Sequence, residues 1–169
     1  ASAGWVILAL VALLVLAVVV VMVLLKTGAR DKVMRFLTNL FPPIRRITAK
    51  LSASRIAGML GMMLSGGYPV ENALTMAENA LEDRESREKV GAVRKAMGEG
   101  KSFAEAMTDT GLFGDFYNRI LKIGSASGHE PQVLSKIAQV YEDQVEEDLS
   151  RMISLIEPVL VALLSILIG

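Results

Sequence analysis

The apolar residues of this chain follow two patterns, with long unbroken runs at both ends and helically spaced apolar positions between them. The first run extends from Trp5 to Leu25 and contains no charged residue. At 1.5 Å per residue, a helix of this length crosses a hydrocarbon core of about 30 Å. A cleaved signal peptide has a shorter apolar core, preceded by positive charge and followed by a small-residue cleavage site, and the chain lacks these features. The pattern therefore predicts a transmembrane helix within residues 1–27.

A second apolar run occupies residues 153–169 and is still apolar where the chain stops. It is interrupted only by Ser154, Glu157, Pro158 and Ser165. We expect it to be the start of a second transmembrane helix, cut short. Because the chain also begins with Ala1 rather than Met, we expect it to be a piece of a longer protein.

Basic residues cluster after the first run, whereas the residues before it carry no side-chain charge. The positive-inside rule then places residues 26 to about 152 in the cytoplasm. Residues 28–44 form a basic juxtamembrane connector, in which the apolar spacing from Arg30 to Phe41 predicts a short amphipathic helix near the bilayer surface, ended by Pro42-Pro43. The basic residues are Lys26, Arg30, Lys32, Arg35, Arg45, Arg46, Lys50 and Arg55.

The middle of the chain, residues 45–152, places apolar residues three and four positions apart, which is the spacing of a buried helical stripe. The intervening loops are short, and no segment of useful length alternates as a strand would. We therefore predict an all-α fold with helices over about 45–65, 69–81, 84–97, 102–107, 113–124 and 131–156. In the first and last of these helices the expected inward residues are Ile47, Leu51, Ile56, Met59, Leu60, Met63, Leu64, Leu134, Ala138, Tyr141, Val145, Leu149, Met152 and Ile156.

Residues with special backbone chemistry mark the ends of these helices. Gly66-Gly67 supplies permissive dihedral angles at the end of the first, and Pro69 opens the next. Ser102 and Glu105 match a capping box, which predicts the start of a short helix. Gly124 falls on a packed face, where its missing side chain would let a neighbouring helix approach closely. The other residues of this face, spaced three and four apart, are Phe113, Phe116, Tyr117, Ile120 and Leu121.

The strongest candidate for chemistry is an acidic group formed by Glu142, Asp143, Glu146, Glu147 and Asp148. Members three and four apart share a helix face and could hold a hard cation. A calcium site generally needs loop carbonyls as well, so a solvated or partner-binding surface is the favoured interpretation. The basic stretch from Lys26 to Arg55 also lies just inside the membrane, so the two surfaces could pair or dock a partner if the chain ends are neighbours.

The remaining motifs do not predict catalysis. His129 has no second histidine, serine or aspartate at a catalytic or metal-binding spacing, and we interpret it as a loop residue. The run Gly124–Gly128 lacks the following Lys-Ser/Thr and the preceding strand of a phosphate-binding loop. The absence of cysteine excludes disulfides and thiolate metal sites. We expect no cofactor, no metal and no nucleic-acid partner.

Glu157 stands at the mouth of the second apolar run and is followed by Pro158. A carboxylate in this position is costly unless it stays near water or meets a partner. Two interpretations remain open. Glu157 is either an interfacial residue that caps the span or, with Pro158, part of a docking or helix-breaking motif.

Several landmarks, taken in order, resemble the F-domain family of inner-membrane platform proteins from type II secretion systems and type IV pilus machines. Residues 54–74, SRIAGMLGMMLSGGYPVENAL, are similar to the family's "aRfartLgtLlssGvPlleAL" block. The resemblance covers about residues 45–169. Ser125 replaces the glutamate that usually follows the glycine of the "iGEesG" block, so a role resting on that carboxylate does not carry over. The further blocks are Gly98–Met107, Thr110–Phe113, Lys122–Gly128, Tyr141–Glu147 and Leu155–Pro158.

The resemblance implies a six-helix cytoplasmic F-domain over residues 45–152, flanked by transmembrane helices and usually present twice in the full protein. It implies no catalytic activity. It implies a platform in the bacterial or archaeal inner membrane that couples a cytoplasmic assembly ATPase to pilin or pseudopilin assembly. Its other partners would be machine subunits, the lipid bilayer and further copies of itself. The candidate docking or structural residues are Gly66, Gly67, Pro69, Gly124, Ser125, Gly128, Glu142, Glu146, Glu157 and Pro158.

Two other classes of function are weighed against the platform. A membrane channel or transporter subunit is suggested by Glu157 near the bilayer. Transporters usually carry polar residues deeper in their spans, and Trp5 to Leu25 has none. A membrane-bound hydrolase that uses the acidic helix would require a divalent metal and substrate turnover.

Overall fold

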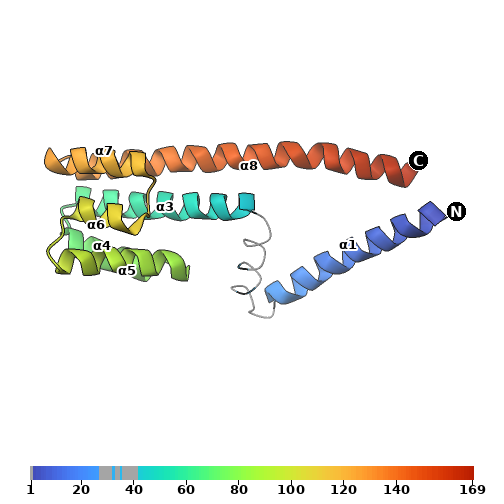
Figure 1. The fold of residues 1–169 in the computed structure, drawn as a ribbon, viewed down its shortest axis with the longest axis horizontal. Coiled ribbons are helices and arrows are strands. Elements are labelled where there is room, and N and C mark those ends of the chain that lie inside the picture. The colour runs from blue at the N-terminus through green and yellow to red at the C-terminus, as the bar shows by residue number, and fades with distance from the viewer. Residues whose placement is uncertain (1, 27–31, 33–34, 36–41) are drawn as a thin grey trace. The chain divides into compact units, whose positions relative to one another are not determined.

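The computed structural model describes residues 2–26, 32, 35 and 42–169, and these contain helices but no strand (Figure 1). The predicted all-α fold is therefore confirmed. The amphipathic helix predicted over Arg30 to Phe41 falls outside the described residues, apart from Lys32 and Arg35. The helices are α1 (Ser2–Lys26), α3 (Pro42–Ser65), α4 (Val70–Ala80), α5 (Arg84–Gly98), α6 (Phe103–Thr110), α7 (Asp115–Ala126) and α8 (Glu130–Ile168).

The chain divides into two compact units, one of Ala1–Ile47 with Leu149–Gly169 and one of Thr48–Asp148. In the first unit, α1 and the end of α8 expose large apolar side chains along their length. Both α1 and α8 contain a stretch that is long and apolar enough to cross a membrane. These stretches coincide with the two predicted spans.

Two helix boundaries that involve proline differ from the prediction. α3 begins at Pro42 rather than Arg45, so the last residues of the predicted 28–44 connector are helical. Proline fits the first turn of a helix because the N–H groups there have no helical partner. At the other end, α8 passes through Pro158 without ending. Of the two interpretations left open for Glu157 and Pro158, the helix-breaking one is therefore contradicted, while the docking role stays a prediction. Long helices tolerate the loss of one backbone hydrogen bond.

The second unit is a bundle in which residues 48–148 contribute six helices, α3 to α8. Successive helices from α4 to α7 each pack on the next. α3 lies beside the first part of α8 (Figure 1), to which it is joined by hydrogen bonds from Lys50 and Ser54. The core is formed by Ala53, Ile56, Ala57, Leu60, Ala73, Leu74, Ala77, Leu81, Val90, Val93, Phe103, Ala106, Met107, Phe113, Leu121, Leu134, Ile137 and Tyr141.

Four of the predicted inward residues are exposed instead. On α7, Phe116 is exposed because the buried stripe of that helix runs through Asn118, Leu121 and Gly124. Leu51 lies outside the buried stripe of α3, which runs through Ala53 and its helical neighbours. Leu149 and Ile156 are exposed because α8 is covered by α7 only along its first part, as far as Val145. The predicted apolar seam of α8 is therefore buried over less than its full length.

A capping box begins α6, as the sequence predicts. Ser102 Oγ accepts a hydrogen bond from the Glu105 N–H at 3.3 Å, and the Glu105 carboxylate accepts one from the Ser102 N–H at 3.0 Å. The Ser102 hydroxyl also donates to this carboxylate, at 2.8 Å, and the hydrogen bonds from the Ser102 N–H and hydroxyl lower the pKa of the Glu105 carboxyl group. The two residues together satisfy backbone donors that a helix start otherwise leaves unpaired.

We expect Ser102→Ala to lower the free energy of unfolding by about 1 kcal/mol, because the helix loses its cap. The measurement is chemical denaturation of the chain in detergent micelles, followed by far-UV circular dichroism. Ser102→Thr keeps a hydroxyl group and serves as the control. Equal losses in both variants would show that the cap is not the cause.

Candidate functional site

The predicted residues at the end of α3 form a tight turn. Gly67 has a φ of 86°. The N–H groups of Gly67 and Tyr68 donate to carbonyls in the last turn of α3, each at 3.1 Å. This is a Schellman ending, which places one residue in the left-handed region that glycine favours. Gly66 does not have a positive φ, and Pro69 is extended before α4. Gly67 and Pro69 thus set the direction of the chain between the two helices.

The predicted residues between α7 and α8 form a second turn of the same kind. Gly128 has a φ of 74°, and the His129 N–H donates to the Gly124 carbonyl at 2.8 Å. Gly124 is buried, and a Cβ built on it would lie 2.5 Å from Val133 Cγ2. The missing side chain therefore allows α8 to pack closely on α7, as the helical spacing predicts.

Ser125 lies next to this contact, with its hydroxyl turned into the protein. The Oγ atom is buried and makes no hydrogen bond with any residue that the structure describes. Buried hydroxyl groups normally have a partner. Serine does not supply the negative charge of the glutamate usual in the F-domain block. Its hydroxyl group also has no hydrogen-bond partner among the described residues.

Small residues of α3, which the sequence reading missed, form its contact with α8. Ser54 Oγ donates to the Ala138 carbonyl at 3.0 Å. A Cβ on Gly58 would meet Ala138 Cβ at 3.7 Å, and one on Gly61 would meet Ser135 Oγ at 2.8 Å. The spacing of Ser54, Gly58 and Gly61 is the available sequence signal, because small residues three or four apart let two helices approach closely.

Three aromatic residues fix the loop before α7 to the first part of α8. The ring centroids of Tyr117 and Tyr141 are 4.8 Å apart, and those of Phe113 and Tyr141 are 6.1 Å apart. Tyr141 Oη accepts a hydrogen bond from the Gly114 N–H at 2.9 Å. Burial raises the pKa of the Tyr141 hydroxyl. Tyr141 thus satisfies the backbone donor at the residue that caps α7.

We expect Tyr141→Phe to lower the free energy of unfolding by about 1 kcal/mol, because the Gly114 N–H loses its acceptor while the ring packing is kept. Thermal or chemical denaturation in detergent micelles measures the loss. Tyr68→Phe is the control, since Tyr68 is exposed. An equal change in the two variants would contradict a specific role for the Tyr141 hydroxyl.

The predicted acidic surface of α8 divides into paired and unpaired carboxylates. Asp148 forms an ion pair with Lys50 of α3 at 2.6 Å, so the basic and acidic stretches meet at this point. Glu142 and Glu146, one turn apart, are exposed and form no ion pair with any described residue. Among the described residues, no three acidic or histidine side chains are placed to hold a metal ion. Glu142 and Glu146 therefore present free negative charge at the bundle surface.

Glu157 lies on the apolar part of α8 and is exposed. One turn earlier, Ser154 Oγ donates to the Ser150 carbonyl at 2.9 Å. Pro158 has no N–H to donate, so the carbonyl four residues before it loses its helical partner. Polar groups are therefore concentrated on one short section of an otherwise apolar helix.

Most of the described bundle matches one protein family. The profile of the type II secretion system (T2SS), protein F, matches residues 56–169. The chain belongs to the protein F family. It is 31% identical over 139 residues to the type IV pilus assembly protein PilC of Myxococcus xanthus, an alignment covering 82% of the chain and 32% of that relative. It is 26% identical over 161 residues to the type II secretion system protein F of Vibrio cholerae, covering 95% and 39%.

The protein F match confirms the resemblance found in the sequence blocks. It includes α3 from Ile56 onward and all of α4 to α8, and so contains every candidate site residue from Gly66 to Pro158. The alignments cover only 32% and 39% of the length of these two relatives, so the chain spans less than half of each. Residues 1–55 lie before the matched region.

Proposed function

We propose that this chain is a non-enzymatic part of an inner-membrane platform that couples a cytoplasmic assembly ATPase to pilin or pseudopilin assembly. The observation that carries the proposal is the protein F match over residues 56–169. Relatives named for type IV pilus assembly and type II secretion support an assembly role. The apolar stretches of α1 and α8 support a place in the membrane. The remaining proposed partners are other inner-membrane subunits, the lipid bilayer and further copies of the chain.

In this proposal, residues 1–27 and 153–169 belong to membrane spans of a multi-pass protein. Residues 28–44 connect the first span to a cytoplasmic F-domain over residues 45–152. The basic residues that follow the first span support this orientation. The compact unit Thr48–Asp148 falls inside the proposed F-domain.

Exposed carboxylates are the proposed docking groups on the F-domain. Glu142 and Glu146 have no described ion-pair partner, so a basic surface on the ATPase would complement them. Glu157 is proposed to dock a polar group of another subunit at or near the membrane, because an unpaired carboxylate there is costly. The turn residues Gly66, Gly67, Pro69 and Gly128 act structurally in this proposal.

Site-specific crosslinking in cells tests the platform. Photo-crosslinkers at Arg87 and Glu142, both exposed, would report partners on two parts of the bundle. Captured proteins are identified by mass spectrometry. We expect Glu142 to capture a secretion or pilus ATPase. Capture of only lipids and transport subunits would instead favour a channel or transporter.

A pull-down with the purified cognate ATPase tests the docking face. We expect Glu142→Lys combined with Glu146→Lys to weaken the association severalfold, because two attractive charges become repulsive. The control is Glu82→Lys combined with Glu99→Lys, which reverses two other exposed charges. If the unmodified chain did not bind the ATPase, and deletion left secretion and piliation intact, the platform proposal would fail.

A further inference from the structure

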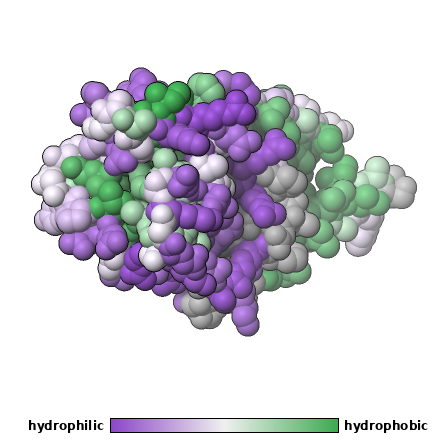
Figure 2. Space-filling model, turned by 60° about the vertical axis from the view of Figure 1, so that its left-hand side comes forward, coloured by the Kyte–Doolittle hydropathy of each residue, from purple (hydrophilic) through white to green (hydrophobic). Residues whose placement is uncertain are grey.

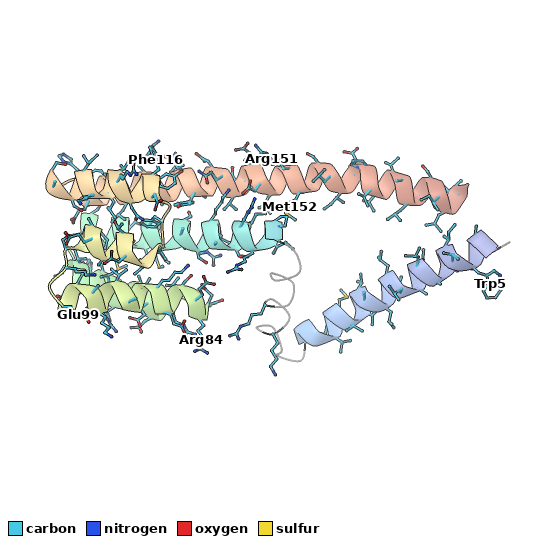
Figure 3. The ribbon with its side chains drawn as sticks, in the orientation of Figure 1. Trp5, Arg84, Glu99, Phe116, Arg151 and Met152 are labelled. Atoms are coloured by element: carbon cyan, nitrogen blue, oxygen red, sulfur yellow. The ribbon has the colours of Figure 1, made fainter. Side chains whose placement is uncertain are left out.

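An apolar strip lies along the surface of α7 and α8. On α7, Phe116 and Ile123 are 68% and 71% exposed, and half-buried Ile120 shares their helix face. On α8, half-buried Val133 and Val140 lie two turns apart. Figure 3 shows Phe116 at the outer edge of the bundle, on the side away from α4 and α5. Figure 2 shows a surface that is largely hydrophilic, with separate hydrophobic patches.

Contacts between α7 and α8 set the register of the two halves of this strip. Gln144 Nε2 donates to Tyr117 Oη at 2.8 Å, and Gly124 lies against Val133. The helices therefore run antiparallel. Val133 and Val140 share the side of α8 that carries Gln144 and faces α7. The apolar residues of the two helices thus adjoin one another along a single strip.

Opposite charges flank the strip on its two edges. Arg119 lies on α7, three residues after Phe116 and four before Ile123. Asp143 lies on α8, three residues after Val140. Both are exposed, and neither forms an ion pair with any described residue. In the antiparallel register, the positions of Arg119 and Asp143 along the helix axes differ by less than about one helical turn, 5.4 Å.

We propose that this strip binds the same strip on a second copy of the chain, with a twofold axis parallel to α7 and α8. The axis places α7 of one copy over α8 of the other, so Arg119 faces Asp143 of the partner subunit. An axis across the helices would place α7 on α7 and bring like charges together. Exposed Lys136 lies between Val133 and Val140 on the same face of α8, at the level of the apolar Ile123 rather than of Arg119. With apolar residues at its centre and Arg119 and Asp143 on opposite edges, the strip is self-complementary, as a twofold contact requires. The inference rests on the proposed platform and names the surface through which its copies meet.

Cysteine crosslinking tests this contact, because the chain has no cysteine of its own. Two copies with different tags are expressed together in membranes, one with Ile123→Cys and the other with Lys136→Cys. Lys136 lies on α8 at the level of Ile123 in the antiparallel register. A short bismaleimide crosslinker is expected to join the two tags. The control replaces Ile123→Cys with Met62→Cys, since Met62 is 70% exposed on α3.

Charge exchange tests the orientation of the two copies. Arg119→Glu and Asp143→Arg are each expected to reduce crosslinking by roughly fivefold, because each reversal acts at two symmetry-related contacts. The combined variant is expected to restore it. No crosslink between the two tags, equal crosslinking from Met62→Cys, or no restoration in the combined variant would overturn the proposed contact. Capture of the ATPase from Glu142 is scored separately, so failure of this contact is distinguishable from failure of the platform.

Discussion

Gly61→Ala is expected to lower the free energy of unfolding of the bundle by about 1 to 3 kcal/mol. A Cβ at this position would lie 2.8 Å from Ser135 Oγ, 3.1 Å from the Ser135 backbone nitrogen and 3.3 Å from the Pro131 carbonyl oxygen. The Ser135 hydroxyl can rotate away. The backbone atoms can move only if α8 shifts relative to α3, and that shift would disturb the core between them. Gly61→Leu is therefore expected to cost more than Gly61→Ala.

Gly98→Ala provides the matched control for Gly61→Ala. Gly98 is also helical, but a Cβ built on it would have no heavy atom within 4 Å. Alanine in a helix is favoured over glycine, so Gly98→Ala is expected to be neutral or stabilising by up to about 1 kcal/mol. Both variants are measured by chemical denaturation in detergent micelles. If Gly61→Ala stabilised the chain as Gly98→Ala does, the close approach of α3 to α8 would be contradicted.

Helix ends could be predicted from the sequence because their chemistry is local. Ser102 and Glu105 are three residues apart and satisfy each other's backbone donors, so the capping box requires no knowledge of the rest of the fold. The turn at Gly67 likewise depends on one left-handed residue and the carbonyls just before it. The same argument explains the error at Pro42, because a proline pair is compatible with either the end of one helix or the start of another.

Contacts between distant residues could not be predicted in this way. The spacing of apolar residues included Leu51 and Leu149 in buried stripes, but their exposure depends on where neighbouring helices begin and end. The contact of Gly58 and Gly61 with α8 is formed by residues without large apolar side chains, so a search for apolar stripes passes over it. The Lys50–Asp148 ion pair joins residues that are 98 positions apart in the sequence. It was predicted only as a general attraction between two charged stretches.

The candidate site was predicted in part. Several short blocks in a fixed order identified the family. These blocks contain residues that form turns or helix contacts in the fold. The hydrogen bond from the Gly114 N–H to Tyr141 was missed, because 27 residues separate the two groups. The docking roles of Glu142 and Glu157 depend on the surfaces of partner proteins, and the sequence of this chain does not describe those surfaces. They therefore stay predictions.

Gly124→Ala is expected to lower the free energy of unfolding by about 1 to 3 kcal/mol, measured as for Gly61→Ala. The added Cβ would lie 2.5 Å from Val133 Cγ2 and 3.2 Å from Val133 Cβ. Valine has a stiff side chain, so it cannot rotate freely to make room. The added Cβ is therefore expected to push α7 and α8 apart or to weaken the hydrogen bond from the His129 N–H to the Gly124 carbonyl in the turn between them.

Combining Gly124→Ala with Val133→Ala tests whether the loss of stability comes from a clash with Val133 or from a general effect of the added side chain. Val133→Ala removes the Cγ2 atom that the Gly124→Ala side chain would meet, so the double variant should lose less stability than the sum of the two single variants. We expect a coupling of about 1 kcal/mol or more. The control pair is Gly98→Ala with Val133→Ala, whose effects should add, because an added Cβ on Gly98 meets no heavy atom within 4 Å. Additive effects in the Gly124→Ala pair as well would show that Val133 is not what requires glycine at position 124.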